Sequence, residues 1–100
     1  MIPVRFHGAA RSELAEEVLY YAEIDRRLGE RLAQAVERAV ALAAEFPDMG
    51  SPYKFGTRRV FPKRFPFSVV YMHRRGEIFV LAVAPFRRKP GYWRSRRHEG

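Results

Sequence analysis

The chain has 100 residues, no cysteine and a formal net charge of +8. A chain of this length can bury one hydrophobic core, so we expect residues 1–100 to form one domain. The lack of cysteine excludes disulfides and thiolate sites. No long apolar segment follows Met1, and no run of about 18 consecutive apolar residues occurs. The sequence therefore predicts a soluble, cytoplasmic protein that does not enter a membrane.

Positive charge is concentrated in the second half of the sequence. Residues 1–46 carry six Lys/Arg and eight Asp/Glu, a balance of −2, whereas residues 47–100 carry thirteen and three, a balance of +10. Such a one-sided excess favours a surface that contacts nucleic acid or an acidic protein. A solvated basic surface without a partner is the alternative interpretation.

The first half predicts a short strand and two helices. Apolar residues alternate over residues 2–6, which is typical of a strand. A first amphipathic helix follows, with apolar residues at helical spacing: Ala10, Leu14, Val18 and Tyr21. Asp25 can cap the start of a second helix, which Pro47 should end. The apolar stripe of this second helix comprises Leu28, Leu32, Ala35, Val36, Ala39, Leu42, Ala43 and Phe46. Its small alanines should let the helices of an antiparallel hairpin approach closely.

The second half predicts a loop and a group of strands. Residues 48–56 are rich in Gly and Pro, which is typical of a loop. Alternating or continuous apolar runs predict three strands, at residues 57–61, 67–72 and 78–84. The predicted order β-α-α-β-β-β corresponds to an α+β fold, with the helical hairpin on one face of a mostly antiparallel sheet. The first strand should join this sheet beside either the last or the first of the later three.

The basic tail, at about residues 85–100, interleaves cations with aromatic residues. Guanidinium groups bind phosphates and carboxylates, and aromatic rings stack on bases, so this combination favours a binding surface. The candidate target-binding residues are Arg87, Arg88, Lys89, Tyr92, Trp93 and Arg94. In the alternative interpretation Tyr92 and Trp93 fold back over the sheet edge and leave the arginines in water.

The order of elements and several motifs resemble the RelE/ParE toxins of type II toxin–antitoxin systems. The motifs are Tyr20-Tyr21, Arg59-Val60-Phe61, Arg64-Phe65-Pro66-Phe67-Ser68-Val69-Val70-Tyr71, and the strand Ile78-Phe79-Val80-Leu81-Ala82-Val83-Ala84 running into Arg87-Arg88-Lys89-Pro90-Gly91-Tyr92-Trp93. The resemblance covers about residues 3–97 and is closest to the ParE-like, plasmid-stabilisation branch. It implies growth arrest and a short cognate antitoxin. Because residues 47–100 are so basic, we expect the C-terminal segment of that antitoxin to be acidic and apolar.

The resemblance implies two molecular targets. ParE-like toxins inhibit DNA gyrase, whereas RelE-like toxins cleave mRNA in the ribosome with Lys, Arg and Tyr side chains. For such a nuclease the matching residues are Lys63, Arg64, Arg87, Arg88 and Tyr92. Arginine clamps phosphate well but is a poor base, so only Lys63 or Tyr92 is suited to accept the proton. Pro85 also stands where many relatives carry a histidine. The sequence therefore favours gyrase inhibition; a non-toxic nucleic-acid-binding module is a further alternative.

Other chemistry is not indicated, and no metal or cofactor is expected. His7, His73 and His98 are scattered and form no ligand pair at i, i+3 or i+4. There is no Gly-rich phosphate loop and no Ser/His/Asp pattern. Carboxylates cluster near the start of the first helix, at Glu13, Glu16 and Glu17. They complement the helix dipole there, so we interpret them as structural.

Overall fold

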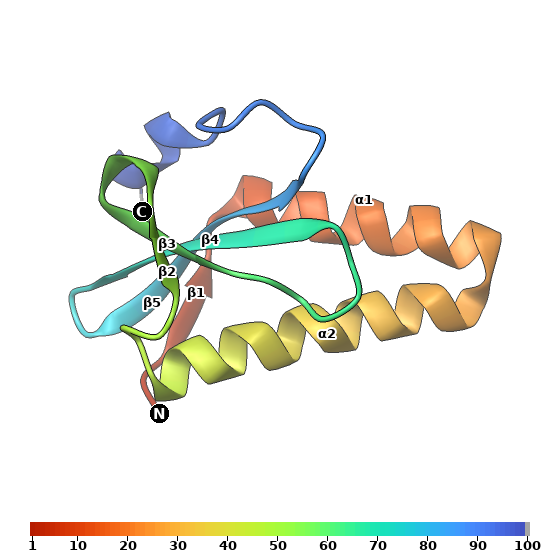
Figure 1. Ribbon diagram of the computed structural model, residues 1–100, viewed down its shortest axis with the longest axis horizontal. Coiled ribbons are helices and arrows are strands. Elements are labelled where there is room, and N and C mark those ends of the chain that lie inside the picture. Colours follow the sequence, from red (N-terminus) through yellow and green to blue (C-terminus); the bar gives the residue numbers. More distant parts are fainter. Residues whose placement is uncertain (100) are drawn as a thin grey trace.

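The computed structural model describes residues 1–99, which form two α-helices and a five-stranded sheet. In chain order the elements are β1 (Val4–Phe6), α1 (Gly8–Ile24), α2 (Arg26–Glu45), β2 (Ser51–Tyr53), the 3₁₀ helix η1 (Lys54–Gly56), β3 (Thr57–Val60), β4 (Phe67–Arg74), β5 (Glu77–Pro85) and the 3₁₀ helix η2 (Arg94–His98). Figure 1 shows α1 and α2 as an antiparallel hairpin along the long axis of the molecule. The predicted α+β fold is confirmed.

The sheet has the strand order β1-β5-β4-β3-β2. The first strand lies beside the last, which is one of the two predicted positions, and is parallel to it; all other pairs are antiparallel. The register of the β4–β5 pair passes from Val70↔Ala82 to Tyr71↔Val80. Leu81 is therefore the extra residue of a β-bulge, which changes the edge toward which the next backbone groups of β5 point.

The segment at residues 48–56 is more ordered than predicted, because it contains β2 and η1. Its glycines and prolines led the sequence pattern to predict a loop. Pro52 pairs with Arg58, and proline is tolerated here because β2 is an edge strand, which needs N–H donors on one side only. Tyr71 fixes the segment from the neighbouring strand: its hydroxyl donates to the Pro47 carbonyl (2.7 Å) and accepts from the Gly50 N–H (3.2 Å). Burial raises the pKa of the Tyr71 hydroxyl. A long-range contact, rather than local pattern, orders this strand.

The helix boundaries follow from side-chain caps. His7 Nδ1 accepts the Ala9 N–H at the start of α1, and Asp25 Oδ1 accepts the Arg27 N–H at the start of α2, as predicted. The two helices approach closely at Gly29, where a Cβ would lie 2.8 Å from both Ala22 Cβ and the Val18 carbonyl oxygen. The absence of a side chain at Gly29 thus sets the helix spacing.

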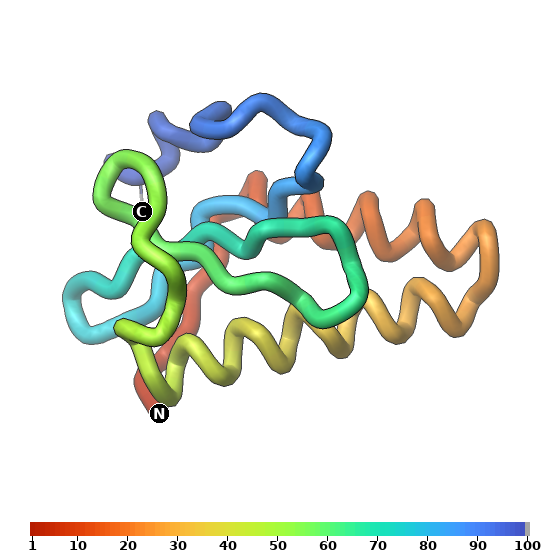
Figure 2. The backbone as a smooth tube through the Cα atoms, in the orientation of Figure 1, coloured from red at the N-terminus to blue at the C-terminus, as the bar shows by residue number. Residues whose placement is uncertain are grey.

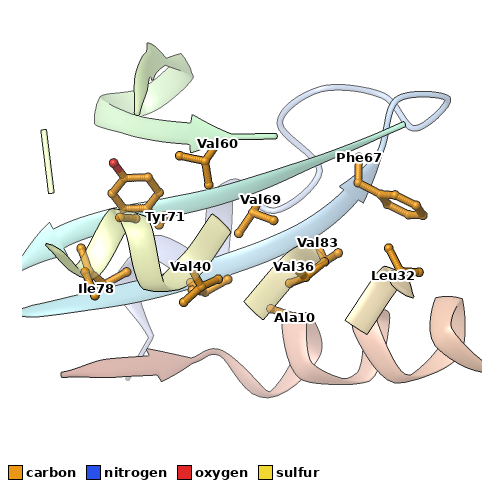
Figure 3. Close-up of a cluster of buried hydrophobic side chains, with 13 residues drawn as sticks. Ala10, Leu32, Val36, Val40, Val60, Phe67, Val69, Tyr71, Ile78 and Val83 are labelled. Carbon is orange, nitrogen blue, oxygen red and sulfur yellow. The ribbon is translucent and has the colours of Figure 1, made fainter. Parts of the chain in front are cut away.

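The main core lies between the helices and the sheet, and Figure 3 shows side chains from both layers facing one another. The buried residues of α2 are Gly29, Leu32, Val36, Val40, Ala43 and Ala44. The predicted stripe was wrong at its edge: Leu42 and Phe46 are 44% and 54% exposed, and Val40 takes a core position instead. The apolar stripe of α2 is therefore wider than the side that faces the core, and the apolar residues at its edge remain exposed to solvent.

A second core cluster occupies the opposite face of the sheet. It comprises Val70, Phe79, Leu81, Ala82, Ala84 and Trp93. Figure 2 traces the C-terminal segment, residues 86–99, across the sheet on the side away from the core of the helices. The central strands are thus covered on both faces, which explains the near-continuous apolar sequence of β5.

Candidate functional site

The C-terminal segment is held to the sheet by its single tryptophan. The Trp93 side chain is 1% exposed, and its ring lies 5.8 Å from the Tyr53 ring and 6.0 Å from the Phe55 ring, between centroids. This is the arrangement in which the aromatic residues fold back over the sheet. In this conformation Trp93 exposes almost no surface, and its role is to support the residues around it.

Glu13 of α1 is the second anchor of this segment. Its carboxylate accepts hydrogen bonds from the Tyr92 hydroxyl (2.8 Å) and from Nη1 and Nη2 of Arg96 (3.0 Å each). The side chains of Glu13 and Arg96 are 14% and 15% exposed, so this is a largely desolvated, two-pronged ion pair. Glu13 therefore does more than complement the dipole of its helix.

The same pair completes the edge of β5. Strand β1 ends opposite Val80, so the backbone of β5 beyond that point has no neighbouring strand on this side. The Val83 N–H donates to Glu13 Oε1 (3.1 Å), and Arg96 Nη1 donates to the Leu81 carbonyl (3.0 Å). Buried backbone groups need such partners. No local sequence pattern could have predicted that Glu13 and Arg96 pair with the β5 backbone, because 83 residues separate them.

Tyr92 is unsuited to act as a base. Burial, followed by the hydrogen bond to Glu13, raises the pKa of its hydroxyl above the usual value for tyrosine. The Arg88 guanidinium lies 3.7 Å from the centroid of its ring. A raised pKa keeps the hydroxyl protonated at neutral pH, where a general base must be able to lose its proton.

The residues matched to a nuclease line different cavities. Lys63 and Arg64, on the connection between β3 and β4, line a groove against α2. Arg88 and Tyr92 line a cleft between the sheet and the C-terminal segment. Arg87 lies beside Glu17 (3.4 Å). The structure thus brings Arg88 and Tyr92 together but places the lysine elsewhere.

Four of the six candidate target-binding residues are exposed: Arg87, Arg88, Lys89 and Arg94. Arg94 covers the ring of Phe55, with its guanidinium carbon 4.5 Å from the centroid. Tyr92 is half-buried and Trp93 is fully buried beneath this surface. The exposed cations of the C-terminal segment are together called the cationic surface (Arg87, Arg88, Lys89 and Arg94).

A groove of about 620 Å³ lies between α2 and the β3–β4 connection, which reaches toward the helix in Figure 1. We call it the α2 groove. Its apolar members are Leu28, Ala35, Ala39, Leu42, Phe61 and Phe65. Its cationic members, all exposed, are Arg31, Arg38, Lys63 and Arg64. The apolar residues that α2 contributes to this groove belong to the stripe that the sequence predicted to be core.

Arg59 lies on the sheet face that carries the C-terminal segment and was not predicted as a site residue. Its guanidinium carbon lies 4.0 Å from the Tyr53 ring centroid and 5.0 Å from that of Phe61. Nη1 makes a long contact with Ser68 Oγ (3.4 Å), whereas Nε is buried without a hydrogen-bond partner among residues 1–99. The family motif Arg59-Val60-Phe61 thus includes a guanidinium whose hydrogen-bonding capacity is only partly used.

The described part of the chain holds no group of three or more His, Cys, Asp or Glu side chains arranged to bind a metal ion. Its histidines serve other purposes or face solvent, His7 being the cap of α1. Within residues 1–99, neither helix combines the length and apolar character needed to cross a bilayer.

Comparison with known families identifies the chain. The family model described as "ParE toxin of type II toxin-antitoxin system, parDE" matches residues 4–90. The chain belongs to the ParE toxin family. It is accordingly the toxin of a type II toxin–antitoxin system, and its partner is a cognate antitoxin. The expected closeness to the ParE-like branch is confirmed.

The fold has a solved counterpart in the chromosomal ParDE toxin–antitoxin system of P. aeruginosa. The two chains share 21% identity with a TM-score of 0.64, and the alignment covers 85% of this ParE toxin and 96% of that chain. No curated protein matched the sequence. The family match ends at Pro90, so Tyr92, Trp93 and Arg96 lie beyond the matched region.

Proposed function

We propose that this ParE toxin arrests growth by inhibiting DNA gyrase in the cytoplasm, through the cationic surface and without cutting RNA. The observation that carries the proposal is the exposure of Arg87, Arg88 and Lys89 on a segment fastened by Trp93 and Glu13. A rigid cationic surface suits recognition of an acidic partner. The raised pKa of Tyr92 and the separation of Lys63 from Arg88 speak against the alternative, a ribosome-dependent mRNA endonuclease.

Replacing each of Arg87, Arg88 and Lys89 by Ala should weaken inhibition of gyrase supercoiling gradually. Exposed charge contacts contribute roughly 0.2–1 kcal/mol each, so we expect inhibition to weaken by at most about fivefold per substitution and by roughly three- to 100-fold in the triple variant. Arg75→Ala, in the distant β4–β5 turn, is the matched control and should inhibit like the parent. The same variants are assayed for mRNA cleavage in a translating extract. Codon-phased cuts that vanish with Tyr92→Phe, while gyrase remains unaffected, would contradict the proposal.

We further propose that the antitoxin binds the α2 groove through an amphipathic helix with an acidic edge. The groove combines accessible apolar side chains with four exposed cations and lies along a helix, a geometry that suits helix-in-groove recognition. Leu42 and Phe61 are its most exposed large apolar members. Charge complementarity should make association fast at low salt and slower at high salt.

Leu42→Asp should reduce antitoxin affinity about 30- to 100-fold, because it removes an apolar contact and repels an acidic helix. Isothermal titration with the antitoxin encoded beside the toxin provides the measurement. Leu19→Asp, on the exposed side of α1, is the control and should bind normally. Equal affinity of the Leu42→Asp and Leu19→Asp proteins would show that the antitoxin binds elsewhere.

A further inference from the structure

Arg59 has the chemistry of an anion receptor that the protein leaves unfilled. Among residues 1–99, its one side-chain hydrogen bond is the 3.4 Å contact with Ser68, and no carboxylate pairs with it. The rings of Tyr53 and Phe61 hold the guanidinium in place from β2 and from the end of β3. A guanidinium so fixed loses little freedom when it binds an anion.

The surroundings of Arg59 form a small basic cleft of about 80 Å³ between the sheet and the C-terminal segment. Arg88 and Lys89 line the same cleft, and Tyr53, Pro90 and Trp93 form apolar parts of its wall. Three cationic residues therefore line a space large enough for several waters. The Glu13 carboxylate lies 3.8 Å from the Arg88 guanidinium, but it pairs more closely with Arg96, at 3.0 Å.

We propose that this cleft receives the carboxylate of an acidic side chain of the protein target, paired with Arg59 and flanked by Arg88 and Lys89. The proposal rests on the proposed function, because it places one contact of the target just inside the cationic surface. A carboxylate fits the planar fork of arginine in a two-pronged pair. A carboxylate is the terminal group of its side chain and can enter a cleft of about 80 Å³, whereas a phosphodiester carries a sugar on each side that must be accommodated at the mouth of the cleft.

The first test measures anion binding by the isolated toxin. Trp93 is the only tryptophan of the chain and lines the cleft, so its fluorescence reports occupancy. Acetate and dimethyl phosphate, both monoanions, are titrated at constant ionic strength. We expect a saturable response to acetate and binding at least about tenfold weaker for dimethyl phosphate, because the small cleft must also accommodate its two methoxy groups. Binding of dimethyl phosphate as tight as that of acetate would overturn the choice of carboxylate and indicate a nucleic-acid backbone.

Substitution of Arg59 decides whether this residue is the receptor. Arg59→Gln should weaken acetate binding about tenfold or more, as expected for loss of a charged hydrogen-bond donor. Arg59→Lys retains charge and most of the side-chain packing but lacks the fork, so it should also bind weakly while keeping the fold, which thermal unfolding verifies. Arg75→Gln lowers the net charge equally at a distant turn and should bind like the parent. Parent-like titrations of the Arg59 variants would overturn the assignment.

The second test separates this inference from the gyrase proposal. In the supercoiling assay, Arg59→Lys should inhibit at least about tenfold less well than Arg75→Gln, because a single buried charge pair carries more binding energy than an exposed one. If the parent and Arg59→Lys proteins inhibit gyrase equally, the target does not bind through the cleft, but the gyrase proposal stands. If the parent leaves gyrase unaffected yet binds acetate through Arg59, the gyrase proposal is wrong, but the cleft remains a carboxylate site.

Discussion

Leu32→Asp should unfold the toxin. Leu32 is completely buried between the helices and the sheet, and Figure 3 shows it near Phe67 at one end of the main core. An isolated carboxylate in such an apolar site has no partner, and its burial costs several kcal/mol in addition to the lost packing of the leucine. A domain of this size has a total stability of about 5–15 kcal/mol, so the penalty rivals the whole. Far-ultraviolet circular dichroism and thermal melting provide the measurement.

The matched control for this prediction is Leu19→Asp, which makes the same chemical change on α1. Leu19 is 65% exposed, so its substitution should change the free energy of unfolding by about 0.5 kcal/mol or less. A soluble Leu32→Asp protein that melts cooperatively near the temperature of the Leu19→Asp protein would show that α2 does not support the sheet in this way.

Glu13→Gln should release the C-terminal segment. The substitution keeps the shape of the side chain but leaves Arg96, which is largely buried, without its counter-charge. Breaking one partner of a buried ion pair typically costs 3–5 kcal/mol; because both side chains here retain some exposure, we expect about 2–3 kcal/mol. Urea unfolding measures the loss. The fluorescence of Trp93 should also shift to the red as the segment leaves the sheet.

The control for this second prediction is Glu16→Gln, which removes an exposed carboxylate one turn away. A double-mutant cycle with Arg96→Gln should give a coupling energy of at least about 1 kcal/mol, because contacting residues are not additive. An unchanged unfolding midpoint for Glu13→Gln, or additivity within about 0.3 kcal/mol, would show that the Glu13–Arg96 pair does not hold the segment. If the segment is released, weaker gyrase inhibition should accompany the loss of stability.

The local sequence determined the helices, the later strands and their order. Helix periodicity, the cap at Asp25 and the stop before Pro47 are properties of neighbouring residues, so they were readable without a structure. The continuous apolar run at 78–84 predicted a strand, and the motifs around it indicated the toxin family. The concentration of cations after residue 47 likewise pointed to the segment that carries the cationic surface.

Only the tertiary structure decided which side chains face solvent and which meet one another. Trp93 and Arg94 are neighbours in one basic, aromatic tail, yet one is buried and the other exposed, because the segment crosses the sheet. The role of Glu13 depends on where β1 ends and on a bulge at Leu81, and both of these are set by strand register. Periodicity records the faces of a single element, whereas an ion pair across 83 residues or a cleft beside Arg59 exists only once separate elements have packed together.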